Sequence, residues 1–516
     1  MIPRINLKNV NEQIDLPVSI KLDGGILKLL SWLRILPGKR YVAEAVWSTE
    51  SSENKVLAKL YLGGKSKNKM TVELDGCQRL TRASLPAAKV VANGAAELSA
   101  WLLLEWLPDA KTLAQVLALE VDSISFAGDG DLAESQLEIV LPPLQKSVEI
   151  LRQMHDRSLQ QKDLHLDNFL YVDGKIFIID AAEVQSASDG SRDRNLSMLL
   201  AQLPHCWWSA VLQNYFSAAD EPLNEQRQQA IKQVARDHRL WRAKDICNKS
   251  QRNCSLFSAG KSFYRWHALW RSQAMNLMPL LDNIETEMAA GQMLKNGGSS
   301  TVVRIQWRGQ DLVVKRYNVK GVWHFLRRCL RSSRALHSWQ QGHLWRVLEL
   351  PTPKPLAVIE KRWGPLRLGG YLVTEYTSGK DIISGFDEAN EGQLLGCISQ
   401  LQVLLKRMAS YQLSHGDLKG SNILSAEQGQ ENSLSFIDLD AACQHISKAV
   451  WRKNFIKDLA RLQRNWSKES QVICHIKCAL SELHSSLNLD GFSRAVKESI
   501  GKIDFEKATI KNRACK

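Results

Sequence analysis

Two stretches of this chain carry the same set of polar residues, and this repetition constrains the fold more than any other feature. The sequences "QQKDLHLDNFLYV", from residue 160, and "LSHGDLKGSNILS", from residue 413, each place an aspartate five residues before an asparagine. Upstream, the apolar runs "KVLAKLY" and "DLVVKRY" each contain a lysine, and downstream "KIFIIDAAEV" and "SLSFIDLDAA" each bring an aspartate after apolar residues. The lysine precedes the first aspartate by 104 residues in one copy and 102 in the other. This agreement predicts a duplicated domain.

The repeated residues are Lys59, Asp163, Asn168 and Asp180 in the first copy, and Lys315, Asp417, Asn422 and Asp438 in the second. Each copy also has an apolar run that ends in a glutamate followed by an aromatic residue, with Glu105 in "WLLLEWLP" and Glu375 in "YLVTEYTSG". A chain of 516 residues is long enough for two domains. We place one domain at residues 1–245 and the other at 246–516, with the boundary between about Asp237 and Gln251.

Periodicity predicts an α+β fold, in which each copy starts with strands and continues with helices. Alternating, β-branched runs indicate strands over residues 302–306, 311–316 and 371–375. Longer periodic segments indicate helices over residues 141–156, 204–245 and 393–412. The fold prediction is therefore two tandem domains with a strand-rich lobe and a helix-rich lobe each.

The repeated groups are those that phosphoryl transfer from ATP requires. A strand lysine pairs with phosphate oxygens, the first aspartate orients the attacking hydroxyl or accepts its proton, and the asparagine and last aspartate hold Mg²⁺. Gly297 and Gly298, in "KNGGSSTVV" just before the Lys315 strand, suit a loop that covers phosphate, although a plain hairpin turn is equally compatible.

"HGDLKGSN" followed by "FIDLD" resembles the catalytic and metal loops of the protein-kinase-like superfamily. The segments "VVKRYN", "SRALHSW", "LPTPKPLAVIE" and "YLVTEYTSGKDI" are similar to the lipopolysaccharide core kinases, the Kdo kinase and WaaP group, over most of residues 290–465. The first half resembles the same group more weakly. The resemblance implies two-lobed kinase domains with ATP between the lobes. It also implies transfer to a sugar hydroxyl (heptose or Kdo) of the lipopolysaccharide inner core or a lipid-linked sugar, at the cytoplasmic membrane face.

The first copy departs from the kinase pattern at two positions of its loop. Gln161 stands where the second copy has the scaffold histidine His415, and His165 stands where Lys419 would steady the transferred phosphoryl group. We therefore expect the second copy, with Asp417 and Lys419, to be the main catalyst. The first copy, with its Asp163, is expected to be a second catalyst or a regulatory pseudokinase.

The carboxylate partners of the two lysines are predicted differently. Glu73, in "MTVELDGCQRL", is a candidate partner for Lys59. Between Arg316 and Leu348 the chain has no Asp or Glu, so Lys315 either pairs with a distant group, for which Glu349 is a candidate, or is oriented by phosphate alone.

Residues 315–334 hold seven Lys or Arg and no acidic residue. A helix starting at Val322 would place an apolar arc, Val322, Trp323, Phe325, Leu326, Cys329 and Leu330, opposite a basic arc, Arg327, Arg328, Arg331 and Arg334. Such a helix suits an anionic membrane surface, and packing against its own lobe is the alternative. The net charge of +14 also favours an anionic partner, and no nucleic-acid motif accompanies it.

The remaining features narrow the functional class. The chain has no run of eighteen apolar residues and begins without a signal-like segment, so we expect a cytoplasmic protein, with peripheral attachment to the inner membrane as an alternative. Cys474 and Cys478 in "CHIKC" suit one helix face better than a metal site.

Two other functions stay open: a protein or small-molecule kinase, and a nucleotide-binding pseudokinase scaffold. The metal-type residues in both copies argue against the scaffold.

Overall fold

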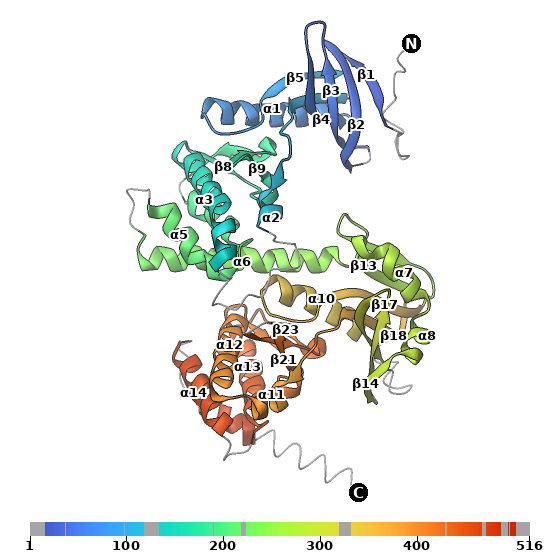
Figure 1. Ribbon diagram of the computed structural model, residues 1–516, viewed down its shortest axis with the longest axis vertical. Coiled ribbons are helices and arrows are strands. Elements are labelled where there is room, and N and C mark those ends of the chain that lie inside the picture. The colour runs from blue at the N-terminus through green and yellow to red at the C-terminus, as the bar shows by residue number, and fades with distance from the viewer. Residues whose placement is uncertain are drawn as a thin grey trace. The chain divides into compact units, whose positions relative to one another are not determined.

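Alternating burial along the first strands builds a six-stranded antiparallel sheet. In β3, Ala45 and Trp47 are buried while Glu44 and Val46 are partly exposed, which is the two-residue period of a strand with one face on a core. The sheet order is β1-β2-β3-β4-β6-β5. Figure 1 shows the computed structural model, which describes residues 16–36, 38–96, 99–117, 134–188, 190–217, 223–318, 332–428, 431–466, 471–486, 494 and 496–501.

Helix α1 packs against this sheet and completes the first strand-rich lobe. The helix has no acidic residue in its first turn, and its buried side includes Met70, Glu73, Cys77 and Leu80. The elements of this lobe are β1 (Val18–Leu22), β2 (Gly25–Leu36), β3 (Arg40–Ser48), β4 (Glu53–Leu62), α1 (Ser66–Arg82), β5 (Val90–Ala96) and β6 (Ser99–Glu105).

Helices dominate the rest of this unit. A core formed by α3, α4 and α5 surrounds short strands that carry the loop residues of the first copy. The elements are β7 (Lys111–Thr112), α2 (Leu113–Val116), α3 (Glu134–Asp156), β8 (Leu159–Gln161), β9 (Phe169–Val172), β10 (Lys175–Ile178), β11 (Val184–Ser186), α4 (Ser191–Leu200), α5 (Trp208–Ser217) and α6 (Glu225–Lys249).

A seven-stranded antiparallel sheet, in the order β12-β13-β17-β18-β16-β15-β14, forms the second strand-rich lobe. The predicted strands at 302–306, 311–316 and 371–375 are confirmed as parts of β15, β16 and β18. The sequence did not predict the three strands, β12 to β14, and the two helices, α7 and α8, that precede them. The elements are β12 (Phe257–Lys261), β13 (Arg265–Trp270), α7 (Ala274–Asp282), α8 (Ile284–Ala290), β14 (Gln292–Gly297), β15 (Ser300–Trp307), β16 (Gln310–Tyr317), α10 (Arg334–Val347), β17 (Pro355–Trp363) and β18 (Leu366–Glu375).

The second helix-rich lobe begins after β18. Its long helix α12 starts at a capping box, in which Asn390 and Gln393 bond each other's backbone N–H groups. The predicted helices at 141–156 and 393–412 are confirmed by α3 and α12. The elements are β19 (Lys380–Asp381), α11 (Ile382–Glu388), α12 (Glu391–Ser410), β20 (Leu413–Ser414), β21 (Ile423–Gln428), β22 (Glu431–Phe436), β23 (Cys443–Gln444), α13 (Lys448–Gln463) and α14 (Gln471–Ser486).

The described residues divide into two compact units, one ending at Ala235 and one starting at Arg236. This boundary lies within α6, and the sequence-based boundary between residues 245 and 246 lies further along the same helix. Each unit has an antiparallel sheet that carries the lysine strand and a helix-rich part that carries the loops, which confirms the α+β prediction with two two-lobed units. Among the described residues, no helix combines the length and the apolar character that crossing a membrane demands. Cys474 and Cys478 lie on α14 as free, exposed thiols.

Candidate active site

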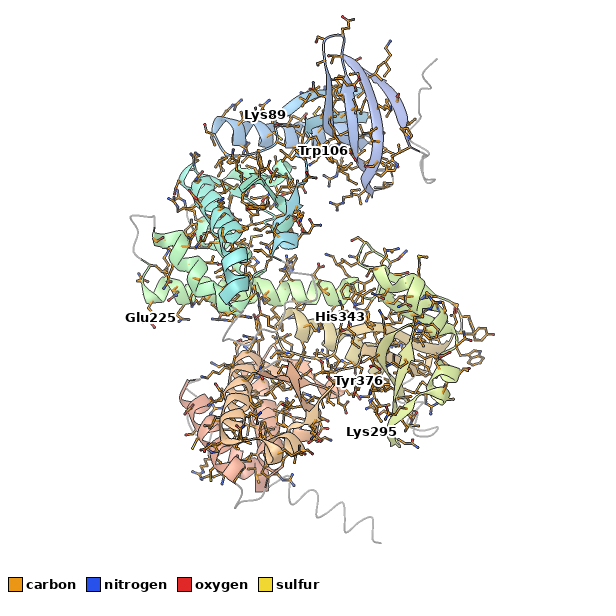
Figure 2. All side chains as sticks on the ribbon, in the orientation of Figure 1. Lys89, Trp106, Glu225, Lys295, His343 and Tyr376 are labelled. Atoms are coloured by element: carbon orange, nitrogen blue, oxygen red, sulfur yellow. The ribbon has the colours of Figure 1, made fainter. Side chains whose placement is uncertain are left out.

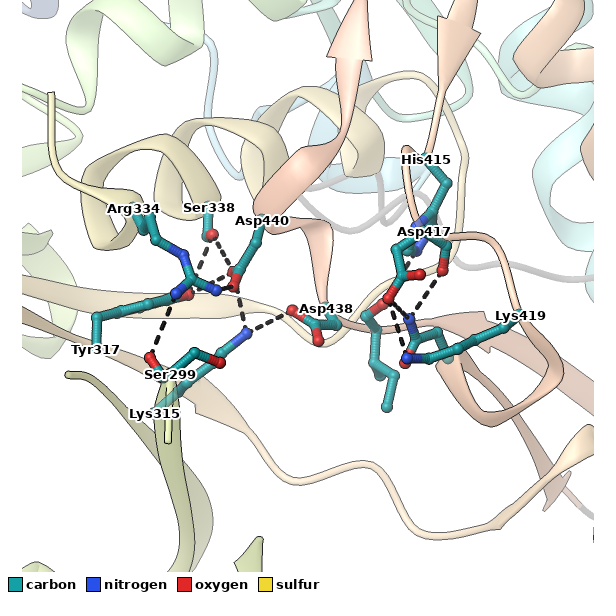
Figure 3. A network of polar contacts seen from close by, with 12 residues as sticks. Ser299, Lys315, Tyr317, Arg334, Ser338, His415, Asp417, Lys419, Asp438 and Asp440 are labelled. Atoms are coloured by element: carbon teal, nitrogen blue, oxygen red, sulfur yellow. Dashed lines mark hydrogen bonds and ion pairs between the residues drawn. The ribbon is translucent and has the colours of Figure 1, made fainter. Parts of the chain in front are cut away.

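In the second unit, strand β16 directs Lys315 toward the loop that follows β22. The Lys315 Nζ lies 2.5 Å from Asp438 Oδ1 and 3.0 Å from Asp440 Oδ1, so the ammonium bridges two carboxylates (Figure 3). The side chain of Lys315 is 13% exposed. Asp438 has a left-handed backbone with φ of 64°, which turns the chain sharply after the strand. Lys315 and Asp438 therefore meet as the sequence spacing predicted.

Asp440 is the centre of the polar network. Its Oδ1 also accepts hydrogen bonds from Tyr317 Oη at 2.8 Å and Ser338 Oγ at 2.7 Å, and its Oδ2 lies 2.5 Å from Arg334 Nη2. Burial alone would raise the pKa of Asp440, but the Lys315 ammonium, the Ser338 hydroxyl and the Arg334 guanidinium together hold it well below its usual range. Asp440 is thus an anion that fixes the strand lysine.

The sequence prediction that Lys315 reaches Glu349 is wrong. Glu349 is buried at the end of α10 and pairs with Arg239 of α6, and it lies 3.5 Å from Arg407 Nη1 of α12. The partner of Lys315 instead comes from the second aspartate of "FIDLD", two residues after Asp438. Because α10 contains no Asp or Glu, the sequence does indicate that the carboxylate comes from another element.

The catalytic-type loop of the second unit joins Asp417, Lys419 and Asn422. Lys419 Nζ lies 3.0 Å from Asp417 Oδ2, and Asn422 Nδ2 donates to the Asp417 carbonyl at 2.9 Å and to its carboxylate at 3.2 Å. The Asp417 side chain is 44% exposed, so it is available to a reactant. In the view of Figure 3, Asp438 lies between this loop and the Lys315 network.

Buried groups beneath the loop hold its backbone. The Asp458 carboxylate of α13 accepts hydrogen bonds from the N–H groups of His415 and Gly416, at 2.7 and 3.0 Å. The His415 Nε2 lies 3.0 Å from the Ile437 carbonyl, and burial lowers the pKa of His415, so a neutral ring that donates from Nε2 fits this contact. His415 therefore has the scaffold role that the sequence predicted for it.

The glycines lie in the tight turn between β14 and β15. Gly297 pairs with Ser300 across the turn, and a Cβ on Gly298 would meet no atom within 4 Å. Neither glycine has a positive φ, so the turn geometry does not itself require glycine. The turn is tied to the network because Arg334 Nη1 donates to the Ser299 carbonyl at 3.3 Å.

In the first unit, Lys59 of β4 pairs with Glu73 of α1 and lies 3.2 Å from Asp180 Oδ1. Tyr61 also donates to Glu73. Burial alone would lower the pKa of Lys59, but the Glu73 and Asp180 carboxylates outweigh burial and raise it. Asp180 has a left-handed φ of 57°, as Asp438 does in the second unit. The structure brings all three predicted residues together.

The loop of the first unit reproduces the contacts of the second with other residues. His165 Nε2 lies 3.1 Å from Asp163 Oδ1, in the manner of Lys419 and Asp417, and Asn168 Nδ2 donates to the Asp163 carbonyl at 2.9 Å. Gln161 Nε2 donates to the Ile179 carbonyl at 2.9 Å, a contact of the kind that His415 makes with Ile437. The substitutions therefore keep the scaffold geometry.

The two units place the lysine-binding carboxylate on different elements. In the first unit it is on the helix, Glu73, while the position two residues after Asp180 is Ala182. In the second unit it is on the loop, Asp440, while the helix presents the hydroxyl of Ser338. In both units the same carboxylate also accepts a hydrogen bond from a tyrosine two residues after the lysine.

Glu105 and Glu375 end strands β6 and β18, and both side chains are exposed. The next residue in each unit, Trp106 or Tyr376, is labelled in Figure 2. Lys55 Nζ lies 4.7 Å from the Trp106 ring centre, and the Arg304 guanidinium lies 4.0 Å from the Tyr376 ring centre. A cation on the aromatic ring thus orders the chain where it leaves each sheet.

The predicted basic arc is partly wrong and partly outside the described residues. Arg334 does not face outward with other arginines, because it is the first residue of α10 and binds Asp440. The apolar arc of Val322, Trp323, Phe325, Leu326, Cys329 and Leu330, and the other three arginines, Arg327, Arg328 and Arg331, lie outside the described residues.

Asn422 and Asp438 have the donor types that suit Mg²⁺. The Asn422 amide nitrogen faces Asp417, which turns its oxygen the other way, and one oxygen of Asp438 is not engaged by Lys315. Oxygen ligands from two side chains, completed by phosphates and water, are the usual Mg²⁺ environment. No group of three or more His, Cys, Asp or Glu suited to a metal occurs in the part of the chain that the structure describes.

Residues 289–477 match the model of the lipopolysaccharide kinase (Kdo/WaaP) family. A 3-deoxy-D-manno-octulosonic acid kinase of Actinobacillus succinogenes is 27% identical over 173 residues, which cover 31% of this chain and 68% of that protein. A solved structure, WaaP in complex with acyl carrier protein, aligns with a TM-score of 0.35 and 15% identity over 46% of this chain and 98% of that one.

Proposed function

We propose that the second unit transfers a phosphoryl group from ATP to a sugar hydroxyl of the lipopolysaccharide inner core, because residues 289–477 match the model of the lipopolysaccharide kinase (Kdo/WaaP) family. The observation that carries the proposal is the meeting of Lys315, Asp438 and the Asp417 loop in one unit. The acceptor sugar is a Kdo or a heptose.

Each residue has one role in the proposed reaction. Asp417, whose side chain is exposed, orients the acceptor hydroxyl and accepts its proton as the hydroxyl oxygen attacks the γ-phosphorus of ATP and ADP leaves. The Lys419 ammonium offsets the negative charge on the oxygens of the transferred phosphoryl group in the transition state. Lys315, held by Asp440, contacts the phosphate oxygens of the donor nucleotide.

Asn422 and Asp438 are the residues that would hold Mg²⁺, which when bound would offset the negative charge of the phosphates. The Gly298 turn, which has open space above it, would let backbone N–H groups approach the phosphates. The exposed strand ends at Glu375 and Glu105 are the proposed contacts for the adenine end of the nucleotide.

We further propose that the first unit is a duplicated kinase-like domain that retains nucleotide binding. Lys59, Glu73 and Asp180 are assembled, and Asp163 and Asn168 are in register. His165 replaces the long side chain and ammonium of Lys419 by a shorter imidazole, which disfavours the phosphoryl-transfer step. Its role is therefore that of a weaker catalyst or a regulatory unit.

The test uses purified protein, labelled ATP, Mg²⁺ and lipopolysaccharide that lacks inner-core phosphate. We expect label in the core sugar, and we expect Asp417→Ala to lower the transfer rate about 100-fold or more, since a positioned base contributes on that scale. Glu388→Gln, which removes one carboxylate from an exposed ion pair with Lys380, is the matched control and should leave the rate unchanged. If the label is found in protein or in a small soluble molecule and is absent from lipopolysaccharide, the proposed sugar acceptor is wrong. The unit would then be a protein kinase or a small-molecule kinase.

A further inference from the structure

Two hairpin turns of the second unit carry exposed aromatic side chains side by side. One turn, residues 262–264, joins β12 to β13, and the other, residues 364–365, joins β17 to β18 (Figure 1). The backbones of the two turns are bonded, because the N–H of Arg362 donates to the Tyr264 carbonyl and the N–H of Gly364 to the Phe263 carbonyl, at 2.8 and 2.9 Å. They form one surface rather than two separate loops.

Three aromatic rings project from this surface. Phe263 is 56% exposed, Tyr264 is 69% exposed and Trp363 is 58% exposed. Phe263 packs edge-to-face with both others, at centroid distances of 5.1 and 6.5 Å. Gly364, with φ of 58°, leaves room for the Phe263 ring, which a Cβ there would approach to 3.2 Å. The rings are therefore held in place without being buried. We call Phe263, Tyr264 and Trp363 the aromatic tip.

The charges around the aromatic tip are predominantly basic. The segments "KSFYR", residues 261–265, and "KRWGPLRL", residues 361–368, contain five Lys or Arg and no acidic residue. Acidic residues pair with four of the five: Arg265 with Asp282, Lys361 with Glu285, and Arg362 and Arg367 with Glu360 of β17. Lys261 is exposed beside the rings. Basic residues outnumber acids here, and the Lys361 ammonium stays half exposed.

We propose that the aromatic tip is a contact surface for an anionic lipid bilayer. Aromatic rings with one apolar face are favoured at the membrane interface, and neighbouring Lys and Arg add attraction to acidic headgroups. A second copy of the chain is the less suitable occupant, because two such tips would bring like charges together. The three exposed rings can insert into the fluid lipid layer without a complementary pocket, which a protein partner would have to provide.

The register of the sheet places the aromatic tip at the end where phosphate would bind. Tyr317 pairs with Ser300 on one side and Gly370 on the other, so the Gly297–Ser300 turn and the β17–β18 turn lie at the same end of the sheet. Four strand spacings separate β13 from β15, about 19 Å. A bilayer held at the aromatic tip would thus lie near the end of the sheet that carries the glycine turn. The placement of the bilayer relative to bound phosphate rests on the proposed function, whereas the contact of the aromatic tip with the bilayer does not.

The test is co-sedimentation of the full chain with vesicles of phosphatidylcholine and phosphatidylglycerol. We expect the triple variant Phe263→Ser, Tyr264→Ser, Trp363→Ser to bind roughly tenfold more weakly, because three partly exposed rings no longer leave water. The control variant Met275→Ser, Ile446→Ser removes two side chains that are 92% and 94% exposed elsewhere in the unit and should bind as the wild type does.

A second experiment distinguishes vesicle binding through the aromatic tip from vesicle binding through the arginines of the predicted basic arc. Replacing Arg327, Arg328 and Arg331 by Gln should reduce mainly the salt-sensitive part of binding, whereas the triple aromatic variant should also lose binding at high salt. Wild-type protein that stays in solution with these vesicles, or a triple aromatic variant that binds as the wild type, would overturn the proposal. A variant defective in vesicle binding beside a wild type with no sugar-kinase activity would leave the membrane surface established and refute only the proposed function.

Discussion

Replacing Asp440 by asparagine tests whether the loop carboxylate is what positions the strand lysine. The side chain is 11% exposed and accepts hydrogen bonds from four groups, two of them cationic: Lys315 and Arg334. Asparagine keeps the shape but removes the negative charge, so both cations face a neutral amide. Lys315 would then remain on Asp438, at 2.5 Å, where it competes with a metal ion for that carboxylate.

The magnitude follows from the contacts that are lost. A hydrogen bond to a charged group contributes about 1.5–3 kcal/mol. Loss of the Lys315–Asp440 contact should therefore lower phosphoryl transfer about 10- to 100-fold, since each 1.4 kcal/mol corresponds to a factor of ten. Because Lys315 competes for Asp438, the Mg²⁺ concentration for half-maximal activity should also rise.

The assay is the transfer rate at varied Mg²⁺, with the melting temperature measured to show that the variant is folded. Glu388→Gln serves as the matched loss of one carboxylate in an exposed pair. A second variant, Asp440→Ala with Ser338→Glu, moves the carboxylate to a helix, as in the first unit, where Glu73 lies on α1, and should recover part of the activity. Asp440→Asn activity and Mg²⁺ dependence within twofold of wild type would refute the positioning role.

Three further predictions concern the first unit and the buried contacts. Asp163→Ala should lower transfer to lipopolysaccharide little or not at all, and a loss equal to that of Asp417→Ala would reverse the roles of the two units. Burial lowers the pKa of His155 from 6.5 to about 4, so the unfolded chain binds the extra proton first. The first unit should therefore lose about 3 kcal/mol of stability as pH falls from 6.5 to 4, and His155→Gln should flatten that dependence in hydrogen exchange of α3. Glu349→Gln removes the carboxylate that pairs with the buried Arg239 and should destabilise the second unit by about 3 kcal/mol, measured by denaturant unfolding, and a change under 1 kcal/mol would contradict it.

Sequence reasoning worked where a residue's role follows from its place on a strand or in a short loop. Lys315, Asp417 and Asn422 were found because the period of a strand and a five-residue spacing survive folding unchanged. The partner of Lys315 could not be predicted, because spacing along the chain does not indicate which distant carboxylate the fold brings to a strand lysine. The backbone at Glu349 has a φ of 57°, and its carboxylate is directed to α6 and α12 instead.

Arg334 was misassigned for a related reason. A helix that starts at Val322 predicts that Arg334 belongs to a basic arc on the protein surface. The described helix α10 starts at Arg334, with Ser333 as its N-cap, and so directs the guanidinium to Asp440. Charge periodicity does not mark where a helix begins, whereas an N-cap residue such as Ser333 does.

The lysine-binding carboxylate lies on a helix in the first unit (Glu73) and on a loop in the second (Asp440), so a movement of the helix has a different effect in each unit. In the first unit the lysine is oriented by α1, so a displacement of that helix would separate Glu73 from Lys59 and leave the ammonium to Asp180 alone. In the second unit the orienting carboxylate is on the same loop as Asp438, so the lysine contact does not depend on a helix-borne acid. Helix α10 contributes there through the neutral Ser338 and through Arg334, which also holds the glycine turn at Ser299. A helix shift would therefore disable the lysine of the first unit directly, whereas in the second it would act first on the glycine turn.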